Sequence, residues 1–206
     1  MYLNPDFPDG GTDAENPVDR DAGGSYTSGR MAATTHSLAE INAMPAADFV
    51  AALGDVFEHA PWVAERAAAG RPYSSVAALH EALMHAVYGA PTATQLAFVR
   101  GHPELGGKLA RAGAMTHASK SEQGGLGLDR LNDEEFARFE RLNGAYRERF
   151  GFPFVICVRR HTRASILAEF ERRLKNDPAA ELAAALVEIG EITRLRLDAK
   201  VRGQGA

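Results

Sequence analysis

Apolar residues recur every three or four positions along most of this chain, the spacing that places them on one face of an α-helix. Each periodic stretch is bounded by residues that favour helix ends. The segment "SLAE" at Ser37–Glu40 has the spacing of a capping box, Pro45 and Pro61 stand where helices begin, and Gly54 stands where one stops. We therefore expect helices over residues 37–44, 45–54, 61–70, 74–89, 92–101, 132–151, 164–177 and 178–197.

One apolar run differs from this pattern. The segment "FPFVICV" at residues 152–158 is continuously apolar and contains β-branched residues, so it fits either a strand or a buried extended linker. We favour the linker, because the chain offers no second run that could pair with it. The fold class is thus all-α, a single helical-bundle domain of about eight helices. Its expected core stripes are Phe136, Phe139, Leu142 and Tyr146; Ile166, Leu167, Phe170 and Leu174; and Leu182, Leu186, Ile189 and Ile192.

The beginning of the chain lacks any apolar period. Residues 1–36 are rich in Gly, Asp, Asn, Pro, Ser and Thr, and such a segment cannot bury enough surface to offset the entropy lost on ordering. We expect a disordered tail over 1–36 and a folded domain over 37–200. Met31 heads a stretch that reads like a natural N-terminus, so the sequence leaves open whether the residues before it belong to the native protein.

Composition and charge exclude several classes of partner. The 27 acidic and 23 basic residues are intermixed and give a formal net charge of −4, so we expect no nucleic acid partner. No run of about eighteen apolar residues could span a membrane, and the start has no signal-peptide pattern, so we expect a cytoplasmic protein. The single cysteine, Cys157, lies inside the apolar run and fits a buried residue in a reducing compartment.

The helical pattern breaks off between residues 101 and 131, where turn-forming residues and proton-handling groups concentrate. His102 precedes Pro103, which disfavours helical geometry and indicates a helix end facing a cleft. In "SKSEQ", Ser119 and Glu122 would share a helix face, with Gln123 one turn from Ser119. These groups could line a pocket for a small polar ligand. Chemistry alone equally allows a histidine that caps a helix and a serine that serves as N-cap.

Other motifs that suggest chemistry are weak. The two histidines of "HEALMH", His80 and His85, are five residues apart, whereas a zinc-binding pair on one helix face needs a spacing of four. "GGKLARAG" lacks the ending of a phosphate-binding loop. The basic clusters "RRHTR" and "RLKND" read as solvated helix ends, with Arg159 as an exception taken up below. We expect no metal site.

Several long segments, in order, resemble the OHCU decarboxylase family: "INAMPAADFVAALGDVFEHAPWVAERA", "QLAFVRGHPELGGKLA", "SEQGGLGLDRL", "LNGAYRERFGFPFVICVR" and "ILAEFERRLKND". The resemblance runs from about residue 37 to residue 197. It implies an all-helical, cofactor-free carboxy-lyase, commonly a homodimer. The implied reaction is decarboxylation of 2-oxo-4-hydroxy-4-carboxy-5-ureidoimidazoline, a small-molecule substrate, to (S)-allantoin at the end of urate oxidation in purine catabolism.

The resemblance also implies roles for particular residues. His102 would be the catalytic base and Glu122 would orient it or relay a proton. Arg159, at the end of "FVICVR", would bind substrate oxygens, and its choice over the adjacent Arg160 follows the family's register. The remaining substrate-binding residues would be Pro103, Ser119, Gln123, Phe154 and Ile156.

Two rival functions stay open at this stage. A helical binding or regulatory module could keep the fold without turnover, although a lost His102, Glu122 or Arg159 would then be expected, and none is lost. A metal-dependent hydrolase is disfavoured by the histidine spacing and by the lack of another ligand cluster.

Overall fold

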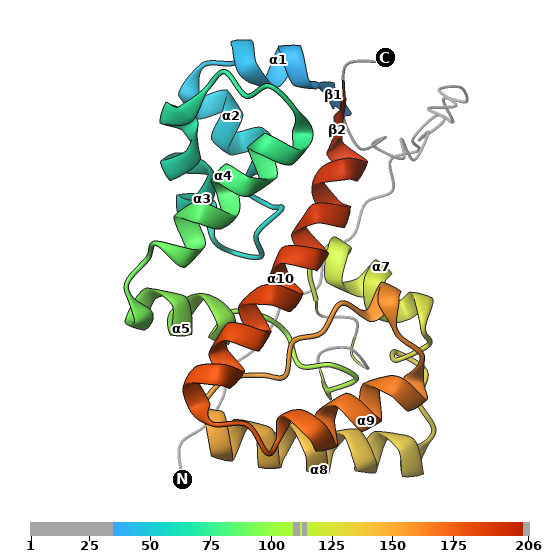
Figure 1. The fold of residues 1–206 in the computed structure, drawn as a ribbon. Helices are drawn as coiled ribbons and strands as arrows, with labels where there is room; N and C mark the ends of the chain where they lie inside the picture. The colour runs from blue at the N-terminus through green and yellow to red at the C-terminus, as the bar shows by residue number, and fades with distance from the viewer. Residues whose placement is uncertain (1–34, 109–111, 113–114, 204–206) are drawn as a thin grey trace, which may run out of the picture. The chain divides into compact units, whose positions relative to one another are not determined.

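The computed structural model describes residues 35–108, 112 and 115–203. Residues 1–34 of the expected tail lie outside the described residues. The described part of the chain is mostly helical, as the sequence predicts (Figure 1). Its α-helices are α1 (Leu38–Ala43), α2 (Ala46–Leu53), α3 (Pro61–Ala67), α4 (Val76–Tyr88), α5 (Thr92–Arg100), α7 (His117–Gly125), α8 (Asp133–Phe150), α9 (Arg163–Arg173) and α10 (Pro178–Lys200); the short 3-10 turns are η1 (Ala68–Gly70) and η2 (Val158–Arg160).

The helix boundaries follow the local chemistry of the sequence. Ser37 forms the expected capping box with Glu40, and Asn132 forms another with Glu135 at the start of α8. The side chain of Ser75 accepts a hydrogen bond from the amide of Ala78 and caps α4. Each of these oxygens satisfies an amide that has no partner within its own helix.

The run "FPFVICV" forms no strand and leads into η2, as the linker interpretation predicts. A two-residue parallel pair was not expected: β1 (His36–Ser37) pairs with β2 (Val201–Arg202), with His36 opposite Val201. The pair joins the start of the described chain to the end of α10. Two-residue strands are too short for an alternating pattern to reveal them.

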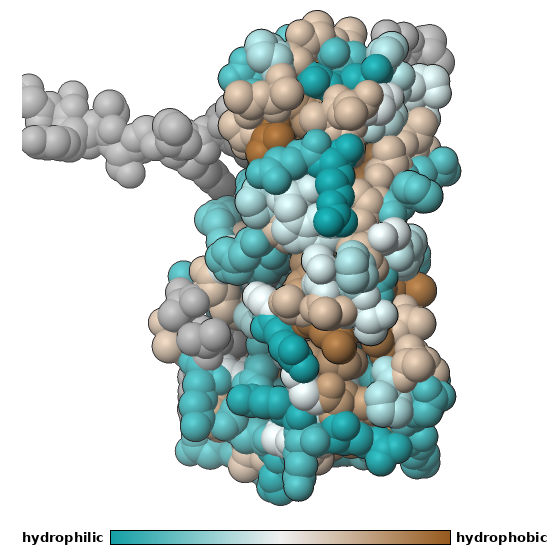
Figure 2. All heavy atoms as spheres, turned by 90° about the vertical axis from the view of Figure 1, so that its left-hand side faces the viewer, coloured by the Kyte–Doolittle hydropathy of each residue, from teal (hydrophilic) through white to brown (hydrophobic). Residues whose placement is uncertain are grey.

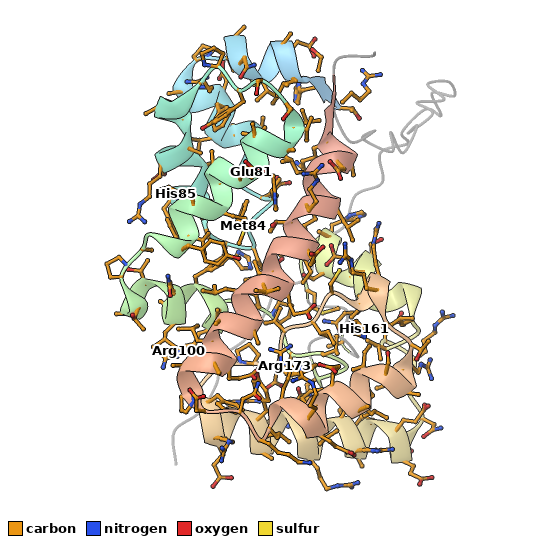
Figure 3. All side chains as sticks on the ribbon, viewed as in Figure 1. Glu81, Met84, His85, Arg100, His161 and Arg173 are labelled. Carbon is orange, nitrogen blue, oxygen red and sulfur yellow. The ribbon has the colours of Figure 1, made fainter. Side chains whose placement is uncertain are left out.

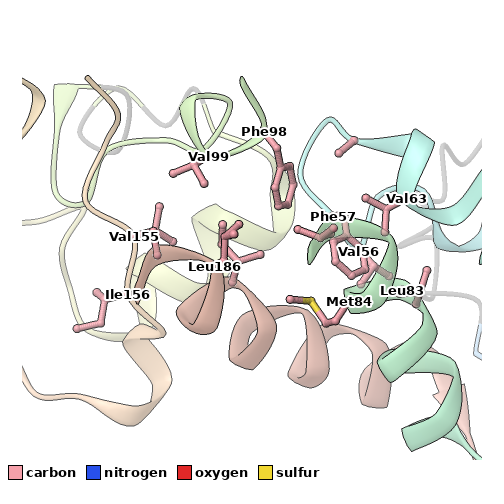
Figure 4. Packing of buried hydrophobic residues seen from close by; sticks show 14 of the residues in the cluster. Val56, Phe57, Val63, Leu83, Met84, Phe98, Val99, Val155, Ile156 and Leu186 are labelled. Carbon is pink, nitrogen blue, oxygen red and sulfur yellow. The ribbon is translucent and has the colours of Figure 1, made fainter. Parts of the chain in front are cut away.

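Packing is organised around α10, which contacts α4, α5 and α8, while α3 packs against both α2 and α4. Figure 4 shows Met84 of α4, Phe98 of α5 and Leu186 of α10 in the same region of the core. The predicted stripes do face this core. Phe139, Tyr146, Ile166, Phe170, Leu182, Leu186 and Ile189 are buried, whereas Phe136, Leu142, Leu167, Leu174 and Ile192 are partly buried against it.

A buried ion pair corrects one expectation from the sequence. Arg173, which begins "RLKND", is 1% exposed and not a solvated helix end. Its Nε donates to Glu181 Oε1 at 2.8 Å, its Nη1 donates to the Val155 carbonyl at 2.8 Å, and the hydroxyl of Tyr146 also donates to Glu181. Figure 3 shows Arg173 pointing inward from α9. Burial of a charge is tolerated here because every strong polar group of the cluster is paired.

Substitution of Arg173 by alanine should lower the free energy of unfolding by about 3–5 kcal/mol, because Glu181 would remain buried without its cation. The neighbouring Arg172 pairs with Glu169 at the surface, so Arg172→Ala is the matched control and should cost no more than about 1 kcal/mol. Urea unfolding followed by circular dichroism measures both values. Equal losses in the two variants would contradict the assigned role of the buried pair.

Candidate active site

The break in the helical pattern builds a partly open cavity of about 40 Å³. Its walls come from the segment after α5, from α7, from the linker before η2 and from α10. Seven of the eight residues expected from the sequence line it, and Arg159 does not. The lining residues are His102, Pro103, Leu105, Ser119, Glu122, Gln123, Phe154, Val155, Ile156, Val158, Ile192 and Arg196.

His102 lies two residues beyond the end of α5 and is buried. Its Nδ1 is 3.1 Å from the carbonyl oxygen of Phe98. Since a carbonyl only accepts, Nδ1 must carry the proton, and Nε2 of the neutral ring is left with its lone pair. Burial lowers the pKa of His102 from 6.5 to about 4, although the charge of Glu58 opposes this shift. The imidazole is therefore neutral near pH 7 and able to accept a proton.

Gln123 fixes the loop that follows His102. Its Oε1 accepts from the amide of Gly106 at 2.9 Å, and its Nε2 donates to the carbonyl of Glu104 at 3.3 Å. Gly106 has a φ of +60°, and a Cβ there would lie 3.1 Å from Leu131, so only glycine fits this turn. Both polar ends of the Gln123 amide are thus occupied by backbone.

The strongest interactions of the site involve two residues that sequence reasoning missed, Arg196 and Glu58. Arg196 donates from Nε and Nη2 to the two oxygens of Glu122, each at 2.8 Å, and from Nη1 to Glu58 at 2.8 Å. Further bonds run from Arg196 to the Val56 carbonyl at 3.3 Å and to the hydroxyl of Ser119 at 3.2 Å. The guanidinium therefore holds together α10, α7 and the loop between α2 and α3.

Glu58 is the most deeply buried carboxylate of this cluster. Besides the bond from Arg196, it accepts from the hydroxyl of Thr116 at 2.7 Å and from that of Ser119 at 3.0 and 3.1 Å. Burial alone would raise the pKa of Glu58, but the hydrogen bond from Thr116 and the charge of Arg196 outweigh burial and lower it. The pKa of Arg196 is raised because its bonds to Glu122 outweigh its burial. Glu58 and Arg196 are therefore charged.

One signal in the sequence could have identified Arg196. It follows Ile192 by four residues, so it continues the apolar stripe of α10, and a charge on a core-facing stripe indicates a buried polar site. Glu58 has no such signal, because it lies in the turns between α2 and α3, where no period applies.

Arg159 takes a different place from the one expected. It is exposed on η2, where Val158 faces the inner cavity and Arg159 faces a second, outer pocket of about 200 Å³. Arg160 forms an ion pair with Glu191, with 2.6 Å between Nη2 and Oε2. The two pockets share Glu122 and Arg196. The outer pocket is lined by Asp55, Val56, His117, Ala118, Ser121, Glu122, Arg159, Leu195, Arg196, Ala199 and Lys200.

The remaining histidines of the helices do not form a metal site. His80 Nε2 is 3.1 Å from the hydroxyl of Thr193 on α10. Figure 3 shows His85 and Glu81 on α4, whereas His161, which precedes α9, lies in another part of the fold. Across the described ranges, no three His, Cys, Asp or Glu side chains are grouped so as to hold a metal ion, and no helix is long and apolar enough to cross a membrane.

The free energy of unfolding should depend on pH, because His102 is buried in its neutral form. The pKa of His102 is about 4 in the folded protein and 6.5 in the ordinary, unfolded state. Between these two pH values the unfolded chain binds one more proton at His102 than the folded protein does. The free energy of unfolding therefore decreases as the pH falls. Below pH 6.5, the free energy of unfolding should therefore fall more steeply in the wild type than in His102→Asn, by roughly 1.4 kcal/mol per pH unit. Urea unfolding at pH 7.5, 6.0 and 5.0 measures the difference. Parallel profiles for the two proteins would show that His102 is not held neutral.

Comparison with known proteins gives a consistent result. The family model for OHCU decarboxylase matches residues 42–198. The chain is 43% identical over 161 residues to the 2-oxo-4-hydroxy-4-carboxy-5-ureidoimidazoline decarboxylase of Haloferax volcanii, a match that covers 78% of this chain and 94% of that protein. It is 39% identical over 158 residues to the protein of the same name from Amia calva, covering 77% of this chain and 90% of the relative.

The fold is also found among solved structures. The crystal structure of an (S)-allantoin synthase superposes with a TM-score of 0.62 at 27% sequence identity, covering 80% of this chain and 54% of that one. Because the family model spans far more than half of the residues and the relatives match along nearly their whole length, the chain belongs to the OHCU decarboxylase family.

Proposed function

We propose that this protein decarboxylates 2-oxo-4-hydroxy-4-carboxy-5-ureidoimidazoline to (S)-allantoin, the last step of urate oxidation. Relatives with this name match the chain at 43% and 39% identity. The observation that carries the proposal is a buried, neutral His102 whose tautomer is fixed with Nε2 free, in a cavity that also holds Arg196, Glu122 and Ser119. This combination supplies a base, an anion-binding group and hydrogen-bonding partners for a polar ring.

The chemistry of the substrate explains why these side chains are sufficient. The carbon that loses carbon dioxide bears a hydroxyl group and lies next to a C=N bond of the ring. The electron pair released from the broken carbon–carbon bond can move toward that nitrogen, so the substrate contains its own electron sink. The protein then has to bind the anion, accept the hydroxyl proton as the carbonyl forms, and admit one proton to one face of the neighbouring carbon.

His102 Nε2 accepts the hydroxyl proton in this scheme, since its neutral form is the populated one near pH 7. Arg196 binds the substrate carboxylate, because a buried guanidinium binds a carboxylate more strongly than an exposed one. Glu122 orients the reacting groups or relays a proton. Arg159 contacts the substrate from the outer pocket.

The other predicted residues shape the cavity. The hydroxyl of Ser119 bonds polar edges of the ring, and Phe154 and Ile156, both buried, exclude water from the reacting carbon. Pro103 holds His102 at the end of α5. Gln123 acts on the substrate through the loop at Gly106, since its amide is bound there.

We further propose a homodimer that acts in the cytoplasm. Tyr88 and Val187 are large apolar side chains with 50% and 56% of their surface exposed, and both line a groove of about 670 Å³. Figure 2 shows hydrophobic residues gathered at the level of α5, with hydrophilic residues around them. A second subunit could cover such a surface.

The activity is tested by following circular dichroism while uricase and hydroxyisourate hydrolase oxidise urate, with and without this protein. Fast growth of a single allantoin enantiomer only in its presence is the expected result, because the enzyme admits the last proton to one face. Decay of the intermediate at its spontaneous rate to racemic product, with folded protein present, would instead favour the binding-module interpretation.

Replacement of the proposed base should remove most of the turnover. We expect His102→Asn to lower kcat by roughly a hundredfold or more, since it removes the proton acceptor while keeping a polar side chain of similar size. His85→Asn, on the exposed face of α4, is the matched control and should behave as the wild type. A folded His102→Asn protein with near-normal kcat would rule out this role for His102.

A further inference from the structure

The inner cavity is too small for the proposed substrate, and this inference rests on the proposed function. A volume of about 40 Å³ has room for only a few water molecules. A five-membered ring with a carboxylate and a ureido arm is several times larger. The outer pocket of about 200 Å³ adjoins the cavity, and the side chains of Glu122 and Arg196 line both spaces. The ion pair between Glu122 and Arg196 therefore separates the inner cavity from the outer pocket.

Arg196 has no free donor in this arrangement. A guanidinium carries five N–H groups, and Arg196 makes five hydrogen bonds to Glu58, Glu122, Ser119 and Val56. A substrate carboxylate can therefore reach the guanidinium only by replacing one of these partners. The two carboxylates are the candidates, because each occupies charge-assisted bonds that a substrate carboxylate could make in its place.

The two carboxylates are not held equally. Glu58 accepts further bonds from Thr116 and Ser119, and its side chain is 2% exposed. Glu122 is 13% exposed, and within the part of the chain that the structure describes its hydrogen bonds are the two from Arg196. Glu122 faces the outer pocket as well as the cavity, so it can leave toward solvent-accessible space. Glu122 is thus the exchangeable partner.

The charge balance adds a second constraint. Glu58 and Glu122 contribute two negative charges and Arg196 one positive charge, so the cluster carries −1 while His102 is neutral. A substrate carboxylate added beside both would bring the total to −2 in a buried space. Release of Glu122 toward the outer pocket keeps the buried cluster at −1.

We propose that the substrate carboxylate displaces Glu122 from the Nε and Nη2 groups of Arg196, which opens the wall between the two pockets. Covalent bonds of the substrate are unchanged at this stage.

The groups around Glu122 favour this assignment. On the cavity side, Glu58 and the bound carboxylate are both negative and repel the released side chain. The outer pocket presents positive charge to it, from the exposed Arg159 and from Lys200, which is paired with Asp55 at 2.7 Å.

Isothermal titration calorimetry with two unreactive ligands tests the exchange. Allantoate has a carboxylate and two ureido groups on one carbon, whereas allantoin is uncharged at pH 7.5. Titrations of the wild type and of Glu122→Gln at pH 7.5 give the dissociation constant of each ligand. Only allantoate should compete with the Glu122 carboxylate, because only allantoate carries a carboxylate.

The Glu122→Gln variant identifies the exchangeable partner. It should bind allantoate about tenfold more tightly than the wild type, since no charged side chain competes for Arg196, whereas its affinity for allantoin should be unchanged. A purely structural role for Glu122 would weaken binding instead, and thermal melting of the variant verifies folding.

Three results would overturn the exchange: equal allantoate affinity in the wild type and Glu122→Gln, weaker allantoate binding by folded Glu122→Gln, or no allantoate binding at millimolar concentration. These ligands do not react, so the outcome is independent of turnover. A negative enantiomer assay would contradict the proposed reaction only. The exchange is tested separately, by calorimetry.

Discussion

The site depends on one buried guanidinium placed between two carboxylates. Arg196 joins Glu58, from the loop after α2, to Glu122, from α7, across separations of 138 and 74 residues. Removing these charges from water is costly, and the cost is offset only because all the donors of Arg196 and the oxygens of Glu58 are bonded. Because all five N–H donors of Arg196 are used in these bonds, none is left for a ligand. A cluster that holds three segments together must therefore be partly taken apart when an anion binds.

The rest of the cavity is held by interactions of the backbone and the aromatic core. Phe98 fixes His102 through its carbonyl, with the two rings edge-on at 5.1 Å between centroids. Behind the opposite wall, the guanidinium of Arg173 lies 4.6 Å from the ring centroid of Phe154 and binds the carbonyl of Val155. Phe154 also stacks on Phe170 at 3.7 Å. Backbone and aromatic contacts thus hold the walls around His102, the proposed base, whereas the contact proposed to exchange is that of Glu122 with Arg196.

The sequence predicts much of this fold because most of it is local. Capping residues such as Ser37 and Asn132 act within three residues, and the apolar stripes follow the helical period, so both can be recognised without knowing the tertiary structure. The cluster of His102, Ser119 and Glu122 was recognisable because turn residues and polar groups interrupt that period. The resemblance to a family then indicated what these groups do.

The parts that sequence reasoning missed are all long-range. The partners of Arg196 and of Arg173 are distant in sequence or buried by packing, and a charge that is paired in the core looks like any other charge in the sequence. The resemblance assigns Arg159 to substrate binding through the family's register, and the turn of η2 places it at the outer pocket. The pairing of β1 with β2 likewise has no local signature.

A crystal structure of the protein with allantoate bound at pH 7.5 tests the central claim most directly. The account predicts that the carboxylate of the ligand occupies the Nε and Nη2 side of Arg196, that Glu58 keeps its bonds to Thr116 and Arg196, and that Glu122 has turned toward the outer pocket. An intact pair between Glu122 and Arg196, with allantoate bound elsewhere, would contradict it.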